Sequence, residues 1–93
     1  MATTTIDRLD QIVESIARET PRQQRPAEAR ELAERWDLDA AKLLEWISLE
    51  AELEKMECTS PRAAWAVLVA GHPAHELALK IAQTRAAVLA EVR

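Results

Sequence analysis

Four residues in the second half of the chain have side chains that bind metal ions: Cys58, His72, His75 and Glu76. The two histidines are three residues apart, a spacing at which side chains on one helix can face the same ion. A zinc site needs three or four ligands, however, and no second cluster supplies the missing ones. We therefore predict no metal site and no cofactor, and we expect His72 at a corner between two helices.

The middle third of the chain is rich in carboxylates. Residues 28–57 contain ten acidic and four basic side chains, whereas residues 1–27 are balanced and residues 58–93 have two acidic and four basic ones. Glutamates spaced as Glu50, Glu52 and Glu54 are typical of a solvated helix face rather than of an acid–base pair. Cys58 has only Lys55 as a nearby cation, so a nucleophilic role is not predicted. We expect that the protein is not an enzyme.

An acidic surface repels phosphates and suits a basic protein partner. The residues predicted to bind that partner are Glu45, Glu50, Glu52, Glu54 and Glu57. In type, the chain resembles small acidic helical proteins such as accessory adaptors and phage-borne inhibitors that occupy basic nucleic-acid sites. The first hypothesis is therefore a protein-interaction module, an adaptor or inhibitor, that acts on a basic nucleic-acid-handling protein.

The composition indicates which fold must position these side chains. The chain has one glycine, and hairpin turns need residues that tolerate positive φ, so strands joined by tight turns are disfavoured. Apolar spacings of three and four predict helices over residues 4–19, 26–36, 40–57 and 74–92. Periodicity does not assign residues 61–70, where the alanine content and a Ser60-Pro61 start favour a helix. The predicted fold is all-α, a compact bundle of four or five helices that forms one domain over residues 1–93.

The apolar positions predict which faces of these helices are buried. The first helix has one stripe, made of Ile6, Leu9, Ile12, Val13 and Ile16. The central helix has two, made of Leu43, Leu44, Ile47 and Ala51 and of Trp46, Leu49, Leu53 and Met56. Two stripes indicate a helix that is packed on two sides. The three tryptophans, Trp36, Trp46 and Trp65, are predicted to be core residues.

Residues 29–48 resemble the helix-turn-helix superfamily. The resemblance rests on the pair Leu32-Ala33, on Leu38 in the turn, and on the Leu43 and Trp46-Ile47 positions. Asp37 occupies the turn position that usually holds glycine, and the would-be recognition face has no Arg, Asn or Gln to read a base. The resemblance implies an alternative function, a DNA-binding transcription regulator. Its DNA contacts would be Arg18, Arg22, Arg25, Arg30 and Lys42.

A third hypothesis is a structural homodimer subunit. It rests on the last helix, whose stripe of Leu77, Ala78, Ile81, Ala82, Val88, Leu89 and Val92 is long enough for an interface. The compartment is predicted from Cys58, which is alone and suits the reducing cytoplasm. The longest apolar run, residues 63–70, is too short for a membrane span, which takes about 20 residues. We expect a cytoplasmic protein without a membrane partner.

Overall fold

The chain folds into a helical bundle, which a computed structural model describes for residues 5–56 and 74–92. Its elements are α1 (Thr5–Glu19), the short 3-10 helix η1 (Arg22–Gln24), α2 (Arg25–Trp36), α3 (Ala40–Lys55) and α5 (His75–Leu89). These parts of the chain contain no strand, and the prediction of an all-α bundle is confirmed. The helix predicted over 61–70, together with Trp65, lies outside the described residues.

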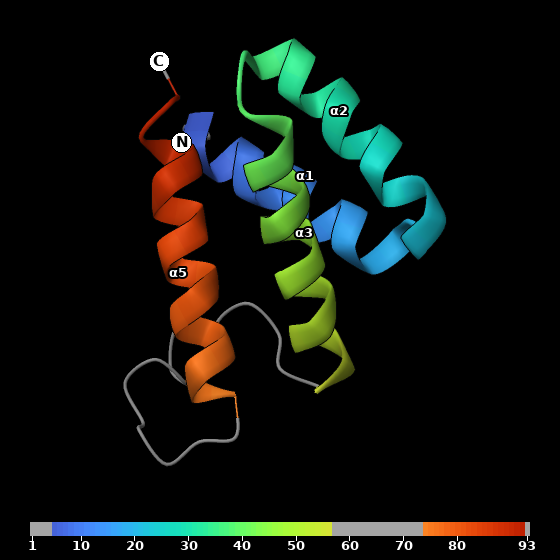
Figure 1. The fold of residues 1–93 in the computed structure, drawn as a ribbon, viewed down its shortest axis with the longest axis vertical. Coiled ribbons are helices and arrows are strands. Elements are labelled where there is room, and N and C mark those ends of the chain that lie inside the picture. The colour runs from blue at the N-terminus through green and yellow to red at the C-terminus, as the bar shows by residue number, and fades with distance from the viewer. Residues whose placement is uncertain (1–4, 57–73, 93) are drawn as a thin grey trace.

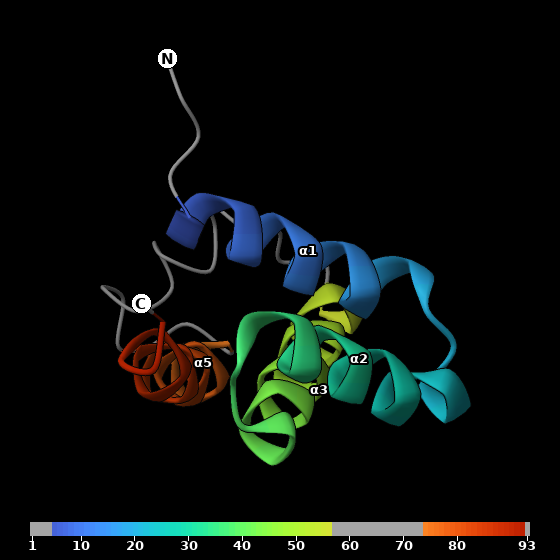
Figure 2. The ribbon, with the colours of Figure 1, turned by 90° about the horizontal axis from the view of Figure 1, so that it is seen from above.

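Helix α3 is the centre of the bundle. It lies between α2 and α5, and α1 crosses behind it (Figure 1). Seen from above, α1 forms a layer across the other helices (Figure 2). Within the described residues, α1, α2 and α5 each pack against α3 much more extensively than against one another. The prediction that the central helix is packed on two sides is therefore correct.

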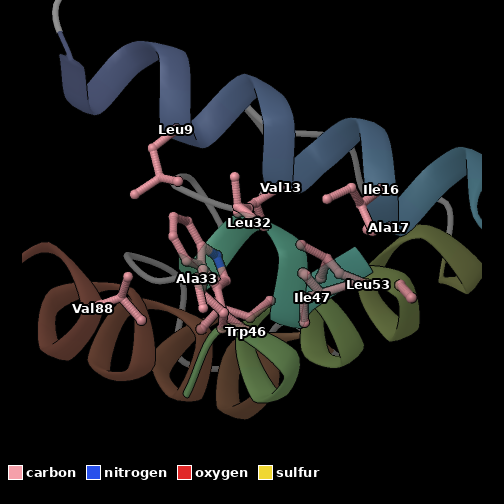
Figure 3. Packing of buried hydrophobic residues seen from close by; sticks show 14 of the residues in the cluster. Leu9, Val13, Ile16, Ala17, Leu32, Ala33, Trp46, Ile47, Leu53 and Val88 are labelled. Carbon is pink, nitrogen blue, oxygen red and sulfur yellow. The ribbon is translucent and has the colours of Figure 1, made fainter. Parts of the chain in front are cut away.

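The core is apolar and is centred on Trp46, which is 1% exposed. The Trp46 side chain extends from α3 toward α1 (Figure 3). Other side chains that are almost fully buried come from α1, α3 and α5: Leu9, Val13, Leu43, Ile47, Leu53 and Val88. No charged or polar residue of the described chain is fully buried. The helices are thus held together mainly by removal of aliphatic and indole surface from water.

The turn between α2 and α3 is fixed by three consecutive residues. Asp37 adopts a left-handed conformation with φ of 56°, which ends α2. The Leu38 N–H then donates to the Ala33 carbonyl at 2.9 Å, the bond of a Schellman motif, and Leu38 packs against the core. Asp39 caps α3, because its Oδ1 accepts from the N–H groups of Ala41 at 2.9 Å and Lys42 at 3.2 Å. The turn predicted at these residues is confirmed.

An ion pair joins the two ends of the chain. Arg85 of α5 donates from Nε and Nη2 to the two carboxylate oxygens of Asp10 in α1, at 2.7 and 2.6 Å. Both side chains are partly buried, at 38% and 26% exposure. A two-pronged bond of this kind fixes orientation as well as distance. It therefore holds α1 and α5 in one relative position.

Several predicted details differ from the structure. Ile6 and Met56 are 41% and 42% exposed, because each lies at a helix end beyond the packed part of its stripe. Ala82 is exposed, and Trp36 is only half-buried. The connector over residues 20–25 contains η1, and α3 ends at Lys55 instead of Glu57. The faces of the helices were thus predicted better than their ends.

Replacing the central indole tests this packing. We expect Trp46→Ala to lower the free energy of unfolding by about 3 to 5 kcal/mol, since it leaves a large cavity among three helices. Denaturant unfolding followed by circular dichroism measures the loss. The matched control is Ile6→Ala, an exposed apolar position, which should cost less than about 1 kcal/mol. Equal costs for the two variants would contradict a core centred on Trp46.

Candidate functional site

An open groove of about 320 Å³ runs between α1 and α2. Ile16 and Leu32 are buried and form its apolar floor, and the half-buried Ile12 extends this floor along α1. The remaining lining residues are polar: Gln11, Ser15, Glu28, Glu31 and Arg35. An apolar floor with polar edges is the usual form of a groove that accepts one face of a peptide.

The charge of the groove comes mainly from its α2 edge. Glu28 and Glu31 are exposed and supply two carboxylates. One cation, Arg35, faces Glu31 with 3.5 Å between Nη2 and Oε1, and both side chains are 66% exposed. Exposed pairs of this kind contribute little to stability, typically less than about 1 kcal/mol. Glu31 therefore remains available to another cation.

The five glutamates predicted to bind a partner do not form one surface. Glu45 and Glu52 are both exposed. They are seven residues apart, or about two helical turns, and so they lie on the same outer face of α3. Glu50 and Glu54 are only partly exposed and lie on the side of α3 that faces its neighbours. Glu57 lies outside the described residues. The expectation of a single solvated face is wrong for Glu50, because the two apolar stripes of α3 lie on either side of it.

Glu50 has an unusual environment for a glutamate. Its Oε1 accepts a hydrogen bond of 3.2 Å from the Trp46 indole Nε1. Burial raises the pKa of Glu50; the Trp46 bond acts in the opposite direction, and the nearby carboxylates of Glu14, Asp10 and Glu54 raise it further. The opposing cation is Arg85, whose pKa is raised by its hydrogen bond to Asp10. Four carboxylates and one guanidinium thus gather where α1, α3 and α5 meet.

The basic residues of the DNA-binding alternative are also dispersed. Arg18 and Arg30 are exposed, on α1 and α2 respectively. Lys42, at the start of α3, faces Glu91 across 3.9 Å from Nζ to Oε2. The structure brings only Arg22 and Arg25 together, around a second hollow that Lys55 also lines. Sequence reasoning missed Lys55, since it lies thirty residues from Arg25 along the chain.

The possible metal ligands do not converge where the chain is described. His75 is half-buried at the start of α5, whereas Cys58 and His72 lie outside the described residues. The described part of the chain contains no group of three His, Cys, Asp or Glu side chains that could hold an ion. Trp46 belongs to the core, and Trp36 packs against it. Neither indole is placed as an open stacking platform.

Comparisons with known proteins do not add to this geometry. No family model matches the sequence, and neither a curated protein nor a solved structure is detectably similar to it. Of the helices in residues 5–56 and 74–92, none is both long and apolar enough to cross a membrane. The function must therefore be argued from the surfaces themselves.

The partly buried carboxylate generates a pH-dependent prediction. Because the pKa of Glu50 is raised on folding, the folded state holds its proton more tightly than the unfolded state does. Stability contributed by this group is present below its unfolded pKa and is lost as the pH rises through its folded pKa. We expect Glu50→Gln to be more stable than wild type at pH values above both pKa values, with a smaller difference near pH 4.5, the ordinary pKa of a glutamate.

Denaturant midpoints at acidic and neutral pH measure this effect. The matched control is Glu45→Gln, which removes an exposed carboxylate from the outer face of the same helix and should change stability little at either pH. A Glu50→Gln protein that is less stable than wild type at neutral pH would show that the attractions of the charged carboxylate, including that to Arg85, outweigh the cost of burying it.

Proposed function

We propose that the protein is a protein-interaction module, an adaptor or inhibitor, whose α1–α2 groove binds a basic amphipathic segment of its partner. The groove itself is the single observation that carries this proposal: an apolar floor of Ile12, Ile16 and Leu32 beside the carboxylates of Glu28 and Glu31. The groove replaces the glutamates of α3 as the best-supported binding surface, because the four described glutamates of that helix are divided between two of its faces.

The chemistry of the groove defines the occupant. An amphipathic helix would place leucine-like side chains on the floor and lysine or arginine side chains against the α2 edge. Burial of apolar surface contributes about 25 cal/mol per Å², so a groove of this size supports a modest affinity. Charge complementarity then provides orientation and a faster encounter with the partner. A nucleic-acid-handling protein is one class of protein that is rich in such basic segments.

A DNA-binding regulator remains the second candidate. The turn at Asp37–Asp39 supports it, since a left-handed residue and a capped second helix are features of a helix-turn-helix. The composition of the exposed face of α3 argues against a DNA-binding function. Besides Lys42, its exposed residues include Ala41, Glu45 and Ser48. None of these is a residue that makes a strong base contact by a two-pronged hydrogen bond.

The homodimer hypothesis loses the stripe on which it rested. Ala78, Ile81 and Val88 of α5 are buried within the chain itself, and Leu77, Leu89 and Val92 pack against the same core. These side chains stabilise the monomer. Only Ala82 of the stripe is exposed and Leu77, Leu89 and Val92 are half-buried, so the stripe offers little apolar surface to a second copy.

A designed probe tests the groove directly. We expect a helical peptide of leucine and lysine only, with the leucines on one face, to bind wild-type protein in fluorescence anisotropy. The double variant Glu28→Gln/Glu31→Gln should weaken binding about fivefold, from two rim charges worth roughly 0.5 kcal/mol each. The control Glu45→Gln/Glu52→Gln makes the same change in charge on α3 and should weaken binding less than twofold.

Two outcomes would contradict the proposal. Equal weakening by both double variants would mean that the peptide responds only to net charge. Amide shift changes confined to α3, with α1 and α2 undisturbed, would move the binding surface to the Glu45 face. A further titration with duplex DNA tests the regulator, since tight binding that falls steeply with salt would favour the second candidate.

A further inference from the structure

A second hollow, of about 260 Å³, lies where η1 and the start of α2 meet the outer face of α3. Three cationic side chains line it, Arg22, Arg25 and Lys55, together with the Ser48 hydroxyl and one carboxylate, Glu52. The excess of positive charge arises because Arg22 and Arg25, which precede the acidic residues 28–57, meet Lys55 near the end of that segment. We propose that this hollow binds the phosphoryl group of a small phosphomonoester.

None of the three cations forms an ion pair within the described residues, and Glu52 is the one carboxylate that shares the hollow with them. The ion pairs found in that part of the chain involve Arg35, Lys42 and Arg85, and none involves Arg22, Arg25 or Lys55. Like charges that converge on one hollow repel one another, and a dianion placed among them removes that repulsion. The hollow thus favours an anion, and favours two negative charges over one.

Arg25 is positioned for such a ligand before it binds. This side chain is half-buried, and its Nε donates to the Thr20 carbonyl at 3.1 Å. This bond fixes the plane of the guanidinium and leaves its terminal nitrogens for a tetrahedral oxyanion. Less conformational entropy is lost on binding when a donor is held in advance.

The rest of the lining selects a small ester over a polymer. Pro26, Leu44 and Ala51 form an apolar wall on which a carbon skeleton can lie, and Glu52 can accept a hydrogen bond from a ligand hydroxyl. A DNA backbone instead presents a row of singly charged phosphates, and the exposed carboxylates of Glu45 and Glu52 on α3 would repel the neighbours of any bound one. A compact phosphomonoester avoids this repulsion.

Titrations of the full chain with sugar phosphate, inorganic phosphate and dimethyl phosphate, followed by backbone amide shifts, test the inference. We expect the monoester to bind most tightly and the singly charged diester least. Arg25→Gln should weaken phosphate binding about tenfold, the effect of one charge-assisted bond. Lys55→Gln, at the exposed end of α3, should also weaken it, and Glu52→Gln should strengthen it by removing a like charge.

Arg30→Gln is the matched control, because Arg30 is exposed on α2 and does not line the hollow. It should change phosphate binding less than twofold. Circular dichroism of each variant shows whether a loss of binding reflects a loss of fold, and Lys55→Gln provides a second reading if Arg25→Gln unfolds. Absence of saturable binding by wild type, or equal effects of Arg25→Gln and Arg30→Gln, would overturn the site. Tighter binding of duplex DNA than of the monoester would also contradict the proposed site.

Discussion

Burial of α3 among three other helices is the constraint on which the rest of the structure depends. Because α1, α2 and α5 pack mainly against α3, the position of each depends on the side chains that this helix presents to it. Trp46 provides the bulk at the centre, in a core otherwise built mostly of aliphatic residues. The Asp10–Arg85 pair then adds a contact of fixed direction between α1 and α5, whereas the hydrophobic effect is itself non-directional.

This central position also determines where the negative charge of the chain can act. A segment's net charge becomes a surface property only if its side chains point outward, and α3 turns Glu50 and Glu54 toward its neighbours. The outer face keeps Glu45 and Glu52, and Glu52 lies beside three cations. The exposed carboxylates of the middle third are therefore divided among α2, the turn after it and the outer face of α3, and Glu28 and Glu31 are the ones that line the groove. Three cations, Arg22, Arg25 and Lys55, gather instead at the second hollow.

The sequence predicts the helices well because their signals are local. Apolar spacing locates the buried faces of α1, α2 and α3. Residues 37–39 predict a turn, because an aspartate tolerates a left-handed backbone and its carboxylate can accept hydrogen bonds from the start of a helix. The partial burial of Glu50 could also have been predicted from the sequence, because a residue between two apolar stripes of a helix must face its core. By contrast, Asp10 and Arg85 are 75 residues apart, and no periodicity connects them. For the same reason, the sequence does not predict that Lys55 lies near Arg22 and Arg25.

The two hollows differ in a way that bears on how the surface is used. Both border α2, but one has an apolar floor with carboxylates at its edge and the other has cations around an apolar wall. Helix α2 contributes to both: Arg25 at its start lines the second hollow, whereas Glu28 and Glu31, further along the helix, line the groove. One helix therefore separates two surfaces of opposite sign. A basic segment in the groove and a small anion in the second hollow would not compete for the same side chains, so the two sites can act independently.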